Sequence, residues 1–240
     1  MLLDAGNTRL KWGVVEAGRW LALGNGRYDN LAELTPLLER GMRCHIASVV
    51  RAEREDALTM LLSRHGIEPC WLASTLRFGE LENAYSIPQQ LGVDRWMALI
   101  AARERTRSAA LVVSVGTAMT VDALSAAGRF LGGVIVPGVA LMQRALQEGT
   151  AQLADAASGE VKTFPTATSD AIQSGVIAAL CGAIERQYAH LERDARMPPR
   201  CFLTGGDAGR VLPCLDFPIE MTPHLVLEGM ERVTRESEPI

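Results

Sequence analysis

The sequence lacks the signals of several common protein classes. No CxxC pair occurs among its five cysteines, and its four histidines are too far apart for an HExxH-type metal site. Scattered cysteines in odd number favour reduced thiols over a disulfide framework. Neither GxGxxG nor GxxxxGK(S/T) occurs, so the usual dinucleotide and P-loop signals are missing, which leaves open nucleotide binding by another kind of loop.

Long apolar runs and excess positive charge are missing as well. No apolar run approaches the length that a membrane span needs, and Asp4 interrupts the apolar N-terminus, so we expect neither a membrane span nor a secretory signal. With 24 Lys and Arg against 28 Asp and Glu, the formal net charge is -4, which offers no basic field for nucleic acid. We therefore expect a cytoplasmic protein without a nucleic-acid or membrane partner.

An internal repeat organises the chain. Leu2 to Leu21 resembles Val112 to Leu131, and in this alignment Gly6 falls on Gly116. Each copy is predicted to form a strand, a glycine turn, a second strand and a hairpin. A glycine turn lets a phosphate approach exposed N–H groups closely. Two such loops favour two facing halves, although either turn alone is equally typical of an ordinary hairpin.

Strand and helix patterns alternate along the rest of the chain, which predicts an α/β fold with helices covering mixed sheets. Further strands are predicted at 44–50, 70–72, 109–115 and 201–203, and helices at 31–38, 52–64, from 92, 139–147, 171–193 and 225–234. Asp29-Asn30 and Ser169-Asp170 are the expected N-caps of two of these helices. The segment 150–165 is small and polar and is expected to connect ordered elements. We expect an N-terminal domain at 1–107 and a C-terminal domain at 108–240.

The helix predicted to begin at Gly92 carries a candidate base. Its apolar residues fall at helical spacing, which leaves Asp94 and Arg95 projecting from the first turn. A helix N-terminus favours the ionised carboxylate, which is the form that a general base requires. In an arbitrary helix, Asp94 would more simply complement the helix dipole. A glycine-rich turn at Thr204 to Ala208 is similarly open, because it could meet a nucleotide or only reverse the chain.

Taken together, these residues resemble type III pantothenate kinases. The motifs, in the order seen in that family, are Asp4-x-Gly6-Asn7-Thr8, Gly92-Val93-Asp94-Arg95, Gly116-Thr117-Ala118-x-Thr120-x-Asp122, Gly132-Gly133-x-Ile135-x-Pro137-Gly138 and Thr168-x-x-Ala171-Ile172-x-x-Gly175. Each motif is weak alone, but the ordered set is specific and spans Leu3 to about Gly229. The resemblance implies membership of the actin, Hsp70 and sugar-kinase superfamily. It therefore implies duplicated actin-like (ribonuclease H-like) domains that hold ATP between two phosphate loops.

The resemblance also implies an activity and a set of site residues. The reaction would be phosphorylation of pantothenate by ATP to 4'-phosphopantothenate, the first step of coenzyme A biosynthesis. The first phosphate loop would consist of Asp4, Ala5, Gly6, Asn7, Thr8, Arg9, Leu10 and Lys11, with Asp4 near Mg²⁺, and Thr117 would serve the second loop. The pantothenate-binding residues would be Tyr85, Gly92, Val93, Asp94 and Arg95, with Asp94 as the base, and Thr168 supplied by the partner subunit of a homodimer.

One position departs from the family pattern. Many members carry aspartate two residues before the Gly-Thr-Ala turn, where it binds the K⁺ or NH₄⁺ that they require, whereas this sequence has Ser114, the repeat mate of Asp4. A neutral hydroxyl is a poor cation ligand, so we expect a weak monovalent-cation requirement. Two other functions stay open because fold alone does not fix chemistry: a regulatory accessory protein, and a kinase or phosphatase for another small molecule.

Overall fold

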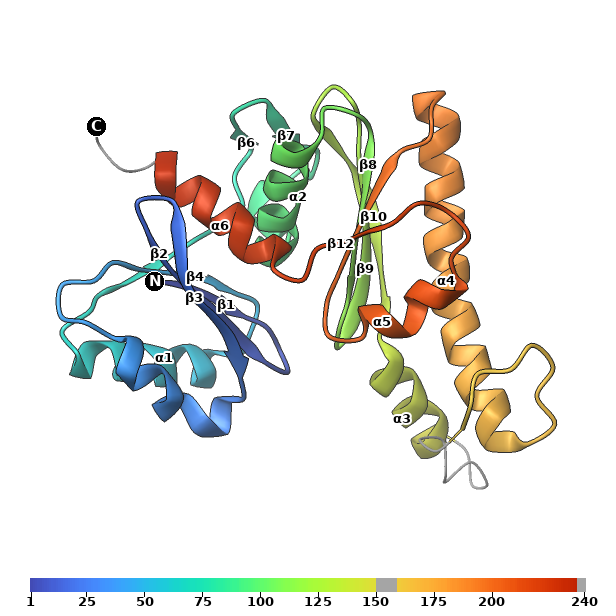
Figure 1. Cartoon of the computed structure of the whole chain (residues 1–240), viewed down its shortest axis with the longest axis horizontal. Coiled ribbons are helices and arrows are strands. Elements are labelled where there is room, and N and C mark those ends of the chain that lie inside the picture. Colours follow the sequence, from blue (N-terminus) through green and yellow to red (C-terminus); the bar gives the residue numbers. More distant parts are fainter. Residues whose placement is uncertain (150–158, 237–240) are drawn as a thin grey trace. The chain divides into compact units, whose positions relative to one another are not determined.

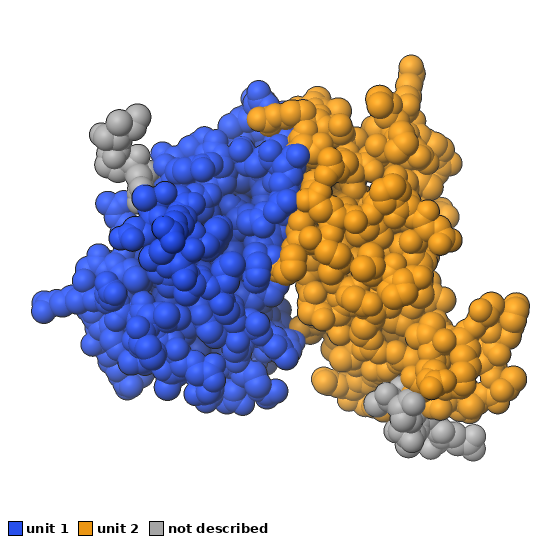
Figure 2. Space-filling view, in the orientation of Figure 1, with its two compact units in different colours: residues 1–105, 224–240 blue, residues 106–223 orange. Residues whose placement is uncertain are grey.

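The computed structural model describes residues 1–149 and 159–236, which fold into two compact units. Unit 1 comprises Met1–Arg105 and His224–Ile240, and unit 2 comprises Thr106–Pro223 (Figure 2). The boundary after residue 105 lies close to the expected division at 107. The expected C-terminal domain, however, included the last helix, which belongs to unit 1. Most of the connection expected at 150–165 lies outside the described residues.

Unit 1 is built on a mixed sheet with the strand order β3-β2-β1-β4-β5 (Figure 1). The strands are β1 (Leu2–Ala5), β2 (Leu10–Glu16), β3 (Arg19–Gly26), β4 (Cys44–Ser48) and β5 (Pro69–Trp71). The first three form an antiparallel meander, and β4 and β5 continue the sheet in parallel with β1. Every residue of β1 is buried, which explains why this central strand reads as an apolar run interrupted only by Asp4.

Unit 2 repeats this arrangement in five strands of a seven-stranded sheet, in the order β10-β9-β8-β11-β12. Its strands are β8 (Ala110–Val115), β9 (Ala118–Leu124), β10 (Arg129–Pro137), β11 (Arg200–Thr204) and β12 (Glu220–Met221). Again the first three are antiparallel in sequence order, and the last two run parallel to the first. The two strand orders match position for position, so the repeat seen in the sequence is also a structural repeat.

Helices of unit 1 pack against its sheet, and the last of them follows unit 2 in the chain. They are η1 (Tyr28–Leu37), α1 (Ala52–Arg64), η2 (Pro88–Gln90), α2 (Val93–Arg105) and α6 (Leu225–Glu236), and a small hairpin of β6 (Arg77–Phe78) and β7 (Leu81–Asn83) precedes η2. One core packs Leu34, Leu58 and Leu62 against the sheet residues Leu3 and Ile46. The helices α2 and α6 lie side by side, since a Cβ on Gly229 would come 1.8 Å from the carbonyl oxygen of Met97.

In unit 2 the long helix α4 (Thr168–Ala195) packs on β8 and β9, next to α3 (Val139–Gly149). The short helices α5 (Ala208–Val211) and η3 (Leu212–Cys214) lie between β11 and β12 in the chain. The core joins the α4 residues Ile177, Leu180 and Ile184 to the strand residues Val113 and Val121. All five cysteines are free thiols, as expected. Every helix of the described ranges 1–149 and 159–236 is too short or too polar to cross a membrane.

The sequence predicted most elements to within two residues, but the predicted starts of two helices were wrong. Instead of an α-helix at 31–38 the chain forms the 3₁₀ helix η1, which starts at Tyr28, contains non-helical Asn30 and includes Pro36. Proline offers no backbone N–H, so a regular α-helical ladder cannot pass through this segment. Helix α4 begins at Thr168 with Ala167 as its N-cap, so Ser169 and Asp170 lie inside its first turn.

Candidate active site

The first predicted phosphate loop is the turn between β1 and β2. Gly6, Asn7, Thr8 and Arg9 form the turn, and Ala5 and Leu10 are the buried residues on either side of it. Asp4 and Lys11 are directly paired across the two strands, so their side chains lie on the same face of the sheet. The sequence therefore predicted correctly that a short glycine-containing turn joins these strands.

Asp4 is a buried carboxyl group, with 6% of its surface exposed. Burial is the main cause that raises its pKa to about 7; the positive charge of Lys11 opposes this rise, and the negative charge of Asp94 adds to it. The negative charge of Asp94 therefore acts on the carboxyl group of Asp4. An ionised Asp4 thus has a strong preference for a cation close by.

Asp94 stands in the first turn of α2, as the sequence predicted. Its Oδ1 accepts a hydrogen bond of 2.8 Å from the backbone N–H of Arg95. Burial raises the pKa of Asp94, while this hydrogen bond, the Arg95 charge and its own backbone N–H lower it. Gly92 is needed beside it, because a Cβ at that position would come 2.6 Å from the same Oδ1. The carboxylate is therefore fixed in place by the start of the helix.

Arg95 and Tyr85, both expected to bind the substrate, meet in unit 1. Arg95 is 6% exposed, and its Nη1 donates a 3.1 Å hydrogen bond to the Tyr85 hydroxyl, with the guanidinium carbon 5.8 Å from the ring centroid. Buried Asn83 holds the segment in shape: its side chain accepts from the Tyr85 N–H and donates to the carbonyls of Thr75 and Pro88. Val93 is also buried and begins α2.

The second predicted loop, in unit 2, is a tight turn of two residues, Gly116 and Thr117, between β8 and β9. Its backbone is held by the N–H of Gly138, which donates a 2.9 Å hydrogen bond to the carbonyl of Thr117. A Cβ on Gly138 would come 2.0 Å from the carbonyl oxygen of Gly116. Gly138, which follows the end of β10, is thus required for the close approach of backbone to this loop.

Ser114 lies one residue from the end of β8, as Asp4 does in β1. It is paired with Thr120 on β9 and with Thr204 on β11, so three hydroxyl side chains lie in a row across neighbouring strands. This position therefore offers neutral oxygens where unit 1 offers a carboxylate.

The third glycine-rich turn packs beneath the second loop. Gly205 has φ of +103°, and a Cβ there would come 2.2 Å from the carbonyl oxygen of Val115, to which the N–H of Asp207 also donates. Only glycine fits such a backbone crossing. Of the two interpretations that the sequence left open, this geometry explains the glycine by chain packing.

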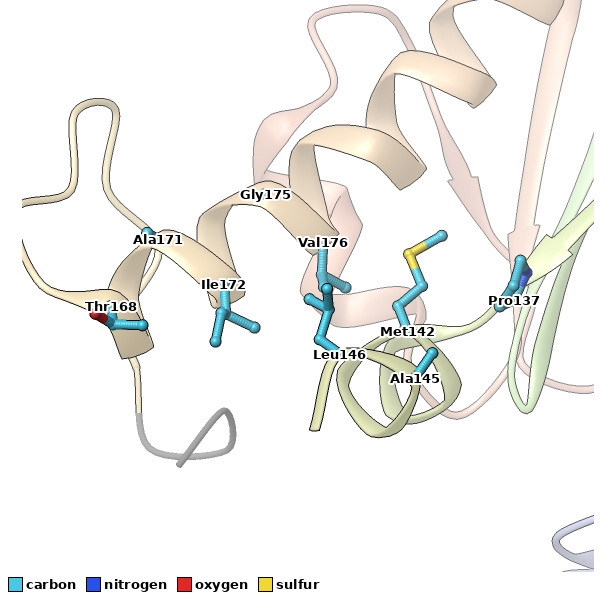
Figure 3. A pocket seen from close by; sticks show the side chains of 9 residues that line it. All are labelled: Pro137, Met142, Ala145, Leu146, Thr168, Ala171, Ile172, Gly175 and Val176. Carbon is cyan, nitrogen blue, oxygen red and sulfur yellow. The ribbon is translucent and has the colours of Figure 1, made fainter. Parts of the chain in front are cut away.

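Thr168 lies in unit 2, at the exposed start of α4. With Ala171, Ile172 and Gly175 it lines one side of a groove of about 620 Å³, whose other side is formed by α3 (Figure 3). The remaining lining residues are Pro137, Met142, Ala145, Leu146 and Val176. All four members of the motif that begins at Thr168 thus line one apolar groove.

Sequence reasoning missed side chains that support the first loop. The Tyr28 hydroxyl donates to the carbonyl of Gly6, and Arg54 donates to the carbonyl of Asn7. Asn83 was missed as well. None of the three stands in a recognisable motif, and Tyr28 and Arg54 lie far along the chain from the carbonyls that they bind. The sequence alone therefore offers no signal for any of the three.

The sequence matches one protein family over most of its length. Residues 1–190 match the family described as type III pantothenate kinase. A protein of that name from Thiobacillus denitrificans is 54% identical over 235 residues, which cover 98% of this chain and 96% of that protein. Its similarity extends beyond the matched family region to nearly the whole chain.

Solved structures with low sequence identity show the fold alone. A Campylobacter jejuni protein described as a Baf family transcriptional activator has a TM-score of 0.62 and 22% identity, with 98% of both chains covered. A Listeria monocytogenes protein described as an N-acetylmannosamine kinase has a TM-score of 0.52 and 13% identity, with 99% of both chains covered. The two mixed sheets flanked by helices are thus the duplicated actin-like fold that the sequence predicted.

Proposed function

This chain belongs to the type III pantothenate kinase family, and we propose that Asp94 is the base of its phosphoryl-transfer reaction. The enzyme transfers phosphate from ATP to pantothenate, the first step of coenzyme A biosynthesis. The observation that supports Asp94 as the base is its geometry: a partly buried carboxylate is fixed at the start of α2 and is next in sequence to buried Arg95.

In the proposed reaction, Asp94 accepts the proton of the pantothenate hydroxyl. The hydroxyl oxygen then forms a bond to the γ-phosphorus of ATP, while the bond between that phosphorus and the β–γ bridging oxygen breaks and ADP leaves. A base works best when its pKa lies closer to the working pH than that of an ordinary aspartate. Burial raises the pKa of Asp94 in that direction.

Arg95 and Tyr85 are proposed to bind the substrate with Gly92 and Val93. A buried guanidinium forms strong hydrogen bonds to carboxylate or phosphate oxygens. The guanidinium of Arg95 is oriented by its 3.1 Å hydrogen bond to the Tyr85 hydroxyl. Since pantothenate carries a carboxylate, Arg95 is the side chain suited to recognise it. The substrate hydroxyl would then be directed to the neighbouring Asp94.

The ATP phosphates are proposed to bind the first loop, Asp4 to Lys11, and Thr117 of the second loop. The donor set fits Mg²⁺, because Asp4 supplies a hard oxygen ligand. Burial raises its pKa to about 7 in spite of Lys11, so a cation close by would favour the ionised form. In the described ranges 1–149 and 159–236 no group of three or more His, Cys, Asp or Glu could hold a metal. This agrees with an ion bound by one carboxylate, phosphate oxygens and water. Bound Mg²⁺ would neutralise charge on the transferred phosphoryl group.

The monovalent-cation requirement is proposed to be weak. Ser114 replaces the aspartate of many relatives, and its strand neighbours Thr120 and Thr204 add only neutral hydroxyls. Hydroxyl groups can bind phosphate oxygens by hydrogen bonds without a cation. Because its substrate is ATP, we also propose that the enzyme works in the cytoplasm.

A homodimer is proposed, in which Thr168 reaches the pantothenate site of the partner subunit. The support is the apolar groove between α3 and α4, which Thr168 lines together with three further residues of its motif. A two-fold dimer would bury the groove on both copies. Light scattering at micromolar concentration should give about twice the mass of the 25.9 kDa chain. A fully active monomer would contradict the proposal.

Comparison of acceptors is the direct test of the function. Purified protein with Mg²⁺ and ATP should release ADP when pantothenate is added, and much less with glycerol. The analogue in which a hydroxymethyl group replaces the pantothenate carboxylate should have a KM about tenfold or more above that of pantothenate, because it cannot pair with Arg95. Equal turnover of all three acceptors would argue for a kinase of another small molecule.

A further inference from the structure

The first phosphate loop is held by side chains from two elements that lie far from it in sequence. Tyr28, the first residue of η1, donates its hydroxyl proton to the carbonyl oxygen of Gly6 at 3.0 Å. Arg54, in the first turn of α1, donates from Nη1 to the carbonyl oxygen of Asn7. Two successive carbonyls of the loop are therefore bound by two side chains of unit 1.

Tyr28 and Arg54 also support one another. The guanidinium carbon of Arg54 lies 4.4 Å from the centroid of the Tyr28 ring, which is the geometry of a cation–π contact. Burial raises the pKa of Tyr28 to about 12, so its hydroxyl keeps the proton that it donates at any physiological pH. Both side chains are half-buried. The pair is thus a small preformed unit that contacts the loop at two adjacent points.

Because the peptide bond is planar, a fixed carbonyl also fixes the direction of the N–H group of the next residue. In a trans peptide the carbonyl oxygen and the N–H of the next residue point in opposite directions. Fixing the carbonyl of Gly6 therefore fixes the direction of the Asn7 N–H, and fixing the carbonyl of Asn7 does the same for the Thr8 N–H. Both N–H groups are directed away from the side chains that hold the loop.

We propose that Tyr28 and Arg54 are positioning residues that hold the first phosphate loop by its carbonyls and so present its N–H groups to the phosphates of ATP. This inference rests on the proposed role of Asp4 to Lys11 in nucleotide binding. A loop that is fixed before binding loses less conformational freedom when the ligand arrives. Asn7 adds a third tie, because its Nδ2 donates to the carbonyl of Val49 at 3.2 Å.

Unit 2 secures its own loop differently, which supports a specific role for the two side chains. There the N–H of Gly138 donates a 2.9 Å hydrogen bond to the Thr117 carbonyl, so a backbone group holds this loop in place. The first loop has four residues between its strands and the second has two. A longer turn has more conformations available, and side-chain ties restrict them.

Binding of MgATP in the absence of acceptor is the test, measured by calorimetry on the full-length protein. Tyr28→Phe removes one hydroxyl and keeps the ring under Arg54, and we expect Kd for MgATP to rise about fivefold. Arg54→Lys keeps the charge but loses the planar guanidinium, and we expect a rise of about tenfold. Because Arg54→Lys preserves long-range attraction to phosphate, its effect reports positioning and not electrostatic steering.

Unit 2 offers matched control variants. Tyr188→Phe also removes a hydroxyl that donates to a backbone carbonyl, that of Pro199 at 3.3 Å, and Arg193→Lys removes an arginine bond to the carbonyl of Ala189. Both controls should bind MgATP within twofold of the wild type, even where Tyr188→Phe lowers Tm. In steady state, Tyr28→Phe should raise KM for ATP and leave KM for pantothenate within twofold.

The outcomes separate this proposal from the proposed function. If folded Tyr28→Phe and Arg54→Lys bind MgATP within twofold of the wild type, the positioning role is wrong. Equal increases in KM for ATP and pantothenate would also overturn it, because they indicate general damage to the unit. If the wild type fails to phosphorylate pantothenate but the two variants still weaken MgATP binding, the positioning role stands and the acceptor assignment fails.

Discussion

The five sheet strands of each unit follow the same order, yet the corresponding positions beside their first turns differ. In unit 1, Asp4 lies at the end of β1 before a four-residue turn held by side chains. In unit 2, Ser114 lies at the same place on β8 before a two-residue turn held by backbone. The shared strand order places a loop at the same position in each unit, but the carboxylate beside the loop is in unit 1, and unit 2 has a hydroxyl there. The two units thus share a strand order and differ in the charge beside their first turns.

Substitution of Asp94 should have the largest effect on activity, because this residue of unit 1 is the proposed base. Asp94→Asn should lower kcat by about 10²- to 10⁴-fold, since the amide cannot accept the hydroxyl proton. Binding of MgATP and Tm should change little. Steady-state ADP release measures the effect, with Asp56→Asn on the exposed face of α1 as the control. Turnover within threefold of the wild type would refute the assignment.

The glycines beside the two loops should differ in tolerance. A Cβ on Gly138 would come 2.0 Å from a carbonyl oxygen of the second loop, whereas one on Gly6 would come 3.2 Å from the carbonyl of Arg9. We therefore expect Gly138→Ala to lower the free energy of unfolding by about 3 kcal/mol, and Gly6→Ala to lower it by less than about 1 kcal/mol. Urea denaturation measures both. Equal losses would show that the two loops are constrained alike.

The pH dependence of stability should distinguish Asp4 from Ser114. Burial raises the pKa of Asp4 to about 7, so the folded state binds this proton more tightly than the unfolded chain does. This group therefore lowers stability as the pH rises from about 4 to about 8, and adds little change above that. From pH 5.5 to 7, without Mg²⁺ or nucleotide, the wild type should lose about 1.6 kcal/mol relative to Asp4→Asn.

Urea denaturation at pH 5.5, 7 and 8.5 measures this difference. Ser114→Ala is the matched control at the repeat position and should follow the pH dependence of the wild type, because it removes no titrating group. A constant difference between Asp4→Asn and the wild type across the three pH values would show that Asp4 titrates as an ordinary exposed aspartate.

The smallest expected effect concerns monovalent cations. With Ser114, the rise in kcat/KM on adding K⁺ should stay below tenfold, which corresponds to about 1.4 kcal/mol of transition-state stabilisation. Ser114→Asp restores a carboxylate at the repeat mate of Asp4 and should increase that dependence. The titration compares KCl with a Tris background at fixed ionic strength. A larger rise in the wild type would reveal a cation site that needs no aspartate.

The sequence predicted the repeat, most strands and the local start of α2 because each depends on residues close together in the chain. It could not place α6 in unit 1. That assignment depends on Gly229 meeting the Met97 carbonyl, a contact between positions separated by the whole of unit 2. The support from Tyr28 and Arg54 was likewise hidden, because these side chains reach the loop only after η1 and α1 have packed. The family motifs supplied the proposed reacting groups, whereas the side chains that hold these groups in place are visible only in the tertiary contacts.

The return of the chain to unit 1 has a consequence for synthesis. Unit 2 is a continuous segment, Thr106–Pro223, whereas unit 1 needs α6 from beyond that segment to cover α2. During translation all of unit 2 is therefore made before unit 1 can close. Domains fold as units as the chain emerges. The part of the enzyme that begins first, and that carries Asp4 and Asp94, is thus the last to become complete.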